Sequence, residues 1–177
     1  GGGKSTLLEE LARRGHSVVP EPGRRIVQRE LARGGDALPW RDVEVFARRA
    51  IEVSLQDLTE ASGNRGWTFF DRGLIDAAAA LEPYDGSAAL TELAGMHRFH
   101  QLVFLAPPWP ELHVTDRERR HAFEEAQQEY AHLEQVYPSL GYDVAILPKV
   151  GVPERADFVL QALASGLRPP PPTPSPA

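Results

Sequence analysis

The sequence contains no cysteine among its 177 residues. This absence excludes disulfide bonds and metal sites built from thiolates, although it leaves the redox compartment open. Long apolar runs are absent as well, because no stretch approaches the roughly 20 residues that a membrane-spanning helix needs. The pattern of residues therefore predicts no membrane partner.

An excess of positive charge is also lacking. The chain has 25 acidic residues against 19 lysines and arginines, which gives a net charge of −6. This balance argues against bulk nucleic-acid binding through a basic face, although local basic clusters are present. The hydrophobic content of 42% is ordinary for a globular protein, and the length fits one domain. We expect one domain over residues 1–166.

What the chain does have is a glycine-rich start that runs directly into a helical apolar pattern. Residues 1–6 are Gly-Gly-Gly-Lys-Ser-Thr, the second half of a phosphate-binding loop of the form G-x-x-x-x-G-K-[ST]. The glycines let successive N–H groups turn toward an anion, and the following helix adds its positive end. Lys4 can reach the β- and γ-phosphates, Ser5 supplies a hydroxyl to Mg²⁺, and Thr6 is placed near the α-phosphate. The expected nucleotide-binding residues are Gly1, Gly2, Gly3, Lys4, Ser5 and Thr6.

The opening glycine of this motif, and the strand that normally precedes it, are not in the sequence. The chain also begins without Met. We therefore expect a fragment, or a product shortened at its N-terminus, whose first strand is missing. The alternative is a flexible glycine-rich end that happens to precede Lys-Ser-Thr.

A short apolar stretch at residues 16–20 predicts a strand, and Glu21-Pro22-Gly23-Arg24-Arg25 follows at its carboxyl end. Ligands in open α/β sheets bind at these carboxyl ends. Glu21 and Arg24 are therefore candidates for a second-substrate site in a loop, and helix-capping charges are the alternative. Helical patterns follow over residues 26–33 and 42–62, and Arg48 and Arg49 in the second are expected on a solvated face.

The stretch Trp67-Thr68-Phe69-Phe70 predicts a buried strand that ends in Asp71-Arg72-Gly73. An acidic residue at this place is typical of a Walker B strand. It can hold Mg²⁺ through water or accept a proton from a substrate hydroxyl. The metal-binding candidates are therefore Ser5 and Asp71. Residues 74–81 are expected to be helical, with Asp76 facing either the site or solvent, and 84–86 to form a turn before a helix at 88–97.

Strands are also expected at residues 101–105 and 141–148, with a final helix opening at Val152. Between these strands, residues 113–120 carry three arginines in four positions. A mobile arginine-bearing lid would close over the phosphates, and Arg117 and Arg120 are its candidates. A helix N-terminus with exposed charge is the alternative. The proline-rich residues 167–177 are expected to form a disordered tail.

Strands that alternate with helices behind a phosphate loop predict an α/β fold with a doubly wound parallel sheet. The chain resembles small bacterial P-loop ATPases of an AAA-labelled, kinase-like family related to nicotinamide-riboside kinase domains. The matching segments are residues 1–6, 21–24, 69–76, 108–111, 116–120 and 140–149. The resemblance implies a three-layer α/β/α P-loop NTPase fold, binding of ATP and Mg²⁺, and a cytoplasmic location. It does not fix a substrate.

Two functions compete at this stage. In a small-molecule kinase, Lys4 and Ser5 hold ATP with Mg²⁺ and Asp71 activates an acceptor hydroxyl. Arg72 and the lid arginines then stabilise the transferred phosphoryl, while Glu21 and Arg24 orient the acceptor. In a nucleotide-dependent switch, slow ATP hydrolysis reports to a partner through an exposed apolar patch. The arginine-rich segment favours the kinase. The sequence leaves the acceptor and the oligomeric state open.

Overall fold

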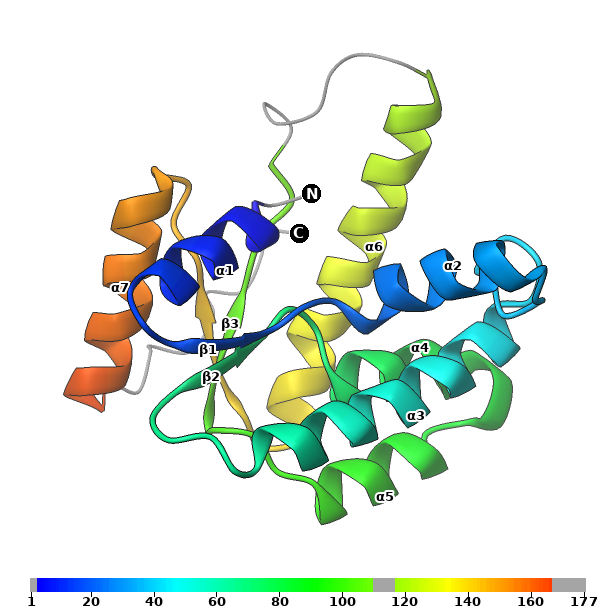
Figure 1. The fold of residues 1–177 in the computed structure, drawn as a ribbon, viewed down its shortest axis with the longest axis horizontal. Coiled ribbons are helices and arrows are strands. Elements are labelled where there is room, and N and C mark those ends of the chain that lie inside the picture. The colour runs from blue at the N-terminus through cyan, green and yellow to red at the C-terminus, as the bar shows by residue number, and fades with distance from the viewer. Residues whose placement is uncertain (1–2, 110–116, 167–177) are drawn as a thin grey trace, which may run out of the picture. The chain divides into compact units, whose positions relative to one another are not determined.

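The computed structural model describes residues 3–109 and 117–166, and the side chains of residues 3–109 and 123–166. The chain divides into two compact units, drawn together in Figure 1. One unit comprises Lys4–Phe99, and the other comprises Gly1–Gly3 with His100–Ala177. Each unit is described by itself.

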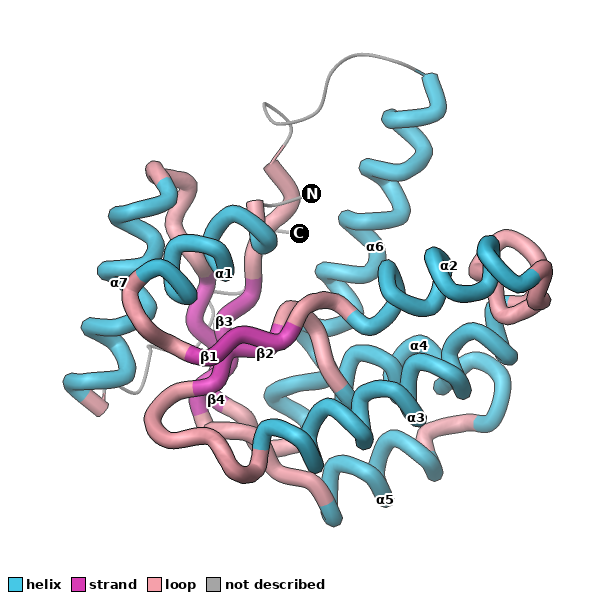
Figure 2. The backbone as a smooth tube through the Cα atoms, in the orientation of Figure 1, coloured by secondary structure: helices cyan, strands magenta, loops and turns pink. Residues whose placement is uncertain are grey.

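The Lys4–Phe99 unit combines one parallel strand pair with a group of helices. Strand β1 pairs with β2, so that Ser17 lies opposite Thr68 and Val19 opposite Phe70. The tube in Figure 2 shows the two strands side by side. The elements in chain order are α1 (Lys4–Arg13), β1 (Ser17–Val19), α2 (Pro22–Arg33), α3 (Val43–Ala61), β2 (Thr68–Phe70), α4 (Leu74–Asp85) and α5 (Ala88–Met96).

Local signals in the sequence explain where these helices begin and end. Helix α2 begins at Pro22, whose fixed φ suits the first helical position, and ends at Gly34 with a φ of 69°. Helix α3 begins after Asp42, whose side-chain oxygen accepts a hydrogen bond from the Val45 N–H at 3.0 Å. As a result, β1 is followed closely by α2, and β2 is followed by a three-residue turn that leads into α4.

The core of this unit lies where α3 packs against α2 and α4, and α4 in turn packs against α5. Small alanines let the helices approach closely, and larger aliphatic residues fill the remaining space. Burying Ile26 stabilises the fold by roughly 1.5–3 kcal/mol relative to exposure. One cluster comprises Ile26, Ala37, Ala50, Val53 and Ala77.

The second unit contains a β–α–β arrangement followed by one more helix. Its elements are β3 (Leu102–Leu105), α6 (Arg117–Ser139), β4 (Asp143–Ile146) and α7 (Val152–Ser165). Strands β3 and β4 are parallel, with Leu102 opposite Asp143 and Leu105 opposite Ile146. Helix α6 packs on both strands, as a crossover between parallel strands does. The turn before β4 contains Gly141, which has a φ of 81°.

The expected α/β class with parallel strands is therefore confirmed. A single sheet in three layers and the domain boundary at 1–166 stay predictions, and the tail at 167–177 lies outside the described residues.

Two local predictions are wrong. Residues 22–25 are the first turn of α2 and not a loop, because Pro22 starts the helix at once. Tyr84 and Asp85 belong to α4, which ends only at Gly86.

The arginine-rich segment also differs from a lid loop where it is described. Residues 117–120 lie in the first turns of α6, and 113–116 lie outside the described residues. The side chains of Arg117 and Arg120 lie outside the description as well. Their role as lid residues stays a prediction.

Candidate functional site

Three of the predicted phosphate-binding residues, Lys4, Ser5 and Thr6, form the start of α1. Gly3 has a φ of 67°, a left-handed conformation that glycine adopts readily, and the helix begins at Lys4. The first N–H groups of a helix have no partner within the helix, and they lie at its positive end. Lys4 and Ser5 therefore contribute backbone donors as well as side chains, and Thr6 is exposed on the same turn. Gly1 and Gly2 lie outside the described residues.

Asp71 follows β2 directly and is held by the sheet itself. Its N–H donates to the Val19 carbonyl at 2.9 Å, which extends the ladder between β1 and β2 by one bond. The side chain is only 5% exposed. Ser5 Oγ donates to Asp71 Oδ2 across 3.4 Å, a long hydrogen bond, and Oδ1 has no hydrogen-bond partner. The structure thus brings together the two residues that the sequence assigns to a metal.

A hydroxyl and a carboxylate at this separation are suited to a magnesium site. Mg²⁺ is commonly held by one or two carboxylates together with substrate phosphates and water. The donor set fits this mode, because Asp71 supplies one carboxylate and Ser5 a hydroxyl next to it. The unpaired Oδ1 of Asp71 adds a second buried acceptor that a water ligand or a substrate hydroxyl could satisfy.

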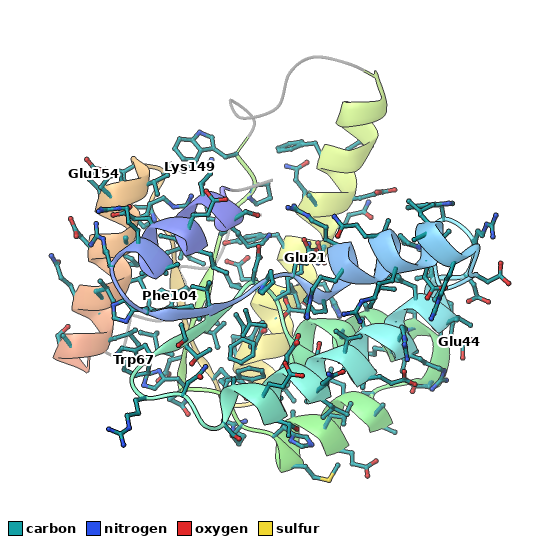
Figure 3. All side chains as sticks on the ribbon, in the orientation of Figure 1. Glu21, Glu44, Trp67, Phe104, Lys149 and Glu154 are labelled. Atoms are coloured by element: carbon teal, nitrogen blue, oxygen red, sulfur yellow. The ribbon has the colours of Figure 1, made fainter. Side chains whose placement is uncertain are left out.

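Arg72 and Glu21 form an ion pair beside Asp71 in the chain. Arg72 Nε lies 3.2 Å from Glu21 Oε1, and both side chains are about one-third exposed or less. Glu21 is the residue that precedes α2, and Figure 3 labels it at the start of that helix. Arg72 has a φ of 63°, the one left-handed non-glycine residue in the described chain. Such a conformation costs energy, and strained residues concentrate at functional sites.

The remaining residues of the 21–25 segment separate into two roles. Arg24 is exposed, whereas Arg25 points inward and forms a bidentate ion pair with Asp57 of α3. Asp57 is buried, so this pair fixes the first turn of α2 on α3. Sequence reasoning missed Asp57. Its spacing from the buried residues Ala50 and Val53 places an acid on the apolar face of α3, a signal that could have predicted a buried partner.

Three other candidates have structural partners instead. Arg48 pairs with Glu44 and Arg49 with Glu52, both within the exposed part of α3, as the solvated-face interpretation predicts. Asp76 accepts a hydrogen bond from the Gly73 N–H at 3.0 Å and thereby caps α4.

The described part of the chain has no helix that is both long and apolar enough to cross a membrane. A comparison with protein-family models matches residues 1–155 to a family described as an AAA domain. The comparison with curated proteins gave no match, and neither did the comparison with solved structures. The family match spans most of the 177 residues and includes both the phosphate loop and Asp71. The chain therefore belongs to this AAA-domain family, a family of nucleotide-binding proteins of the P-loop ATPase and kinase-like type.

Proposed function

We propose that the protein is an ATP-dependent kinase that transfers the γ-phosphoryl group to a hydroxyl of a small-molecule acceptor. The observation that carries the proposal is the environment of Asp71. Its carboxylate is buried, one oxygen contacts Ser5 at the start of α1, and the other oxygen has no partner. A carboxylate placed between a phosphate loop and an open hydrogen-bonding position is suited to act as a base.

The two oxygens of Asp71 suggest a division of work. Oδ2 and Ser5 Oγ would hold Mg²⁺, directly or through water, and the ion would neutralise charge on the β- and γ-phosphates. Oδ1 accepts the proton of the acceptor hydroxyl. The hydroxyl oxygen then forms a bond to the γ-phosphorus as the bond from that phosphorus to the oxygen of ADP breaks.

The neighbouring charged residues supply positioning and charge. Lys4 binds the β- and γ-phosphates, and Arg72 neutralises charge on the transferred phosphoryl group. Glu21 holds Arg72 through the ion pair and orients the acceptor with the exposed Arg24. Arg117 and Arg120 stay candidates for closing over the phosphates. A cytoplasmic location belongs to the same proposal.

A second candidate, a nucleotide-dependent switch, is favoured by one observation. Several large apolar side chains are exposed between residues 31 and 45, and a switch requires exposed apolar surface to report to a partner. Leu31 is 62% exposed and Trp40 is 64% exposed, and Val43 and Val45 are also exposed. A switch would hydrolyse ATP slowly and would need no acceptor.

Measuring ADP release with and without a panel of nucleosides, ribosides and other hydroxyl compounds separates the two functions. For a kinase, at least one acceptor should stimulate ADP release, and Asp71→Asn should slow that reaction roughly 10²–10⁴-fold. ATP affinity should change much less, because Lys4, Ser5 and the loop backbone still hold the phosphates. Asp42→Asn is the matched control, because asparagine also caps α3 well. Stimulation that survives Asp71→Asn removes this residue from the mechanism, and no stimulation by any acceptor favours the switch.

A further inference from the structure

Arg155, in the first turns of α7, is a buried cation without a counter-charge. Arg155 is 2% exposed, and arginine is almost never fully buried unless it is paired. No carboxylate of the described residues forms an ion pair with it, and Nε has no hydrogen-bond partner. Burial lowers the pKa of Arg155, as expected for a guanidinium that has lost water without gaining an acid. A buried charge without a counter-charge destabilises the fold, so a role for Arg155 outside stability has to be considered.

The guanidinium of Arg155 donates a hydrogen bond to the phosphate loop. Nη1 donates to the carbonyl oxygen of Gly3 across 3.4 Å, a contact within one unit that joins residues 152 positions apart. Gly3 is the last glycine of the loop, and its φ of 67° is left-handed. A residue near the C-terminal end of the family match therefore contacts the backbone of the nucleotide-binding motif.

The planarity of the peptide bond turns this contact into a constraint on the phosphate site. The Gly3 carbonyl and the Lys4 N–H belong to the same trans peptide unit, so they point in opposite directions. A donor that fixes the carbonyl fixes the direction of the N–H. Lys4 is the first residue of α1, and its N–H has no acceptor four residues earlier within the helix. A cation on the carbonyl also polarises the peptide unit and strengthens that N–H as a donor.

We propose that Arg155 is a positioning residue of the phosphate loop. Its guanidinium holds the Gly3 carbonyl so that the Lys4 N–H points at the bound phosphate. The inference rests on nucleotide binding by the loop, but not on phosphoryl transfer. It therefore holds equally for the kinase and for the switch.

Replacing Arg155 with methionine should weaken nucleotide binding without lowering the stability of the nucleotide-free protein. Removing an uncompensated buried charge should leave the unfolding midpoint of the nucleotide-free protein unchanged or raised. The dissociation constants of Mg·ATP and of pyrophosphate, measured by calorimetry, should rise about 10- to 100-fold, the range of one charge-assisted hydrogen bond. Arg155→Lys should recover most of the affinity because it keeps the charge. Arg29→Met, which removes an exposed arginine from α2, should change neither quantity.

Dissociation constants within threefold of the wild type for Arg155→Met would overturn the inference, whatever happens to stability. A lowered unfolding midpoint with unchanged affinity would show a purely structural role. If the methionine variant does not fold, the neutral Arg155→Gln is judged by the same affinities, and unchanged binding again overturns the inference. Lys4→Ala separates this failure from failure of the loop itself. If Lys4→Ala weakens binding and the Arg155 variants do not, only the role of Arg155 is lost.

Discussion

Replacing Arg72 with glycine or with alanine separates the backbone cost of this residue from the contribution of its side chain. Both variants lose the ion pair with Glu21, a partly exposed pair worth roughly 0–1 kcal/mol. Only the alanine variant keeps the left-handed strain at a φ of 63°, which costs about 1–2 kcal/mol for a residue with a Cβ. The glycine variant in turn loses roughly 0.4–1 kcal/mol of stability relative to the alanine variant, because glycine makes the unfolded chain more flexible.

The glycine variant should therefore be more stable than the alanine variant by about 0.5–1 kcal/mol. For a chain of this length, that difference corresponds to roughly 1–4 °C in the unfolding temperature. Urea denaturation and thermal unfolding of the nucleotide-free protein both measure it. Both variants should turn over about 10²-fold more slowly or worse, because neither has a cation to stabilise the transferred group.

Gly66 offers a matched control for the backbone argument. Its φ is 77°, and a Cβ added there would meet no atom within 4 Å, so Gly66→Ala introduces backbone strain without a clash. The same 0.5–1 kcal/mol should be lost in that variant. Equal stability of Arg72→Ala and Arg72→Gly would refute the reasoning, because it would mean that the left-handed conformation at position 72 costs no more than the roughly 0.4–1 kcal/mol that glycine loses through a more flexible unfolded chain.

Two further predictions concern charges of the Lys4–Phe99 unit. Lys4→Ala should weaken ATP binding by roughly 1.5–3 kcal/mol while leaving the circular dichroism spectrum unchanged, and unaltered affinity by calorimetry would show that the loop does not bind phosphate. Asp57→Asn should lower the free energy of unfolding by about 1–3 kcal/mol, because it removes the buried counter-charge of Arg25, whose own side chain stays partly exposed to water. The double variant Arg25→Met, Asp57→Leu should recover most of this loss in urea denaturation, and a failure to recover would mean that packing, not charge, dominates at this pair.

Features encoded within a short stretch of sequence could be predicted. Three features depend on neighbouring residues: the helix that follows the glycines at Lys4, the strand formed by the apolar run before Asp71, and the long helix capped by Asp42. The start of α2 was missed because its local signal is ambiguous. Pro22 suits both a turn and the first position of a helix, and only packing of that turn on α3 decides between them.

The contacts that organise the site could not be predicted, because they join distant parts of the chain. Arg25 and Asp57 are 32 residues apart, and Arg155 and Gly3 are 152 apart. Ser5 and Asp71, 66 residues apart, are the exception, because a phosphate loop and an acidic residue after a strand each have a sequence signature. No periodicity in a single sequence relates such positions. The strain at Arg72 was also beyond prediction, since arginine gives no local sign of a positive φ.

The turn Asp71-Arg72-Gly73 also limits how this protein can diverge. At Asp71 the constraint is chemical, because the proposed reaction needs a carboxylate at this position. The constraint at Arg72 is conformational, because the backbone favours glycine while the proposed reaction needs a cation. At Gly73 space is limiting, since an added Cβ would lie 3.2 Å from the ring of Phe99. Saturation mutagenesis should therefore give three different tolerance profiles at adjacent positions, and a larger residue at position 73 should appear only together with a smaller one at position 99.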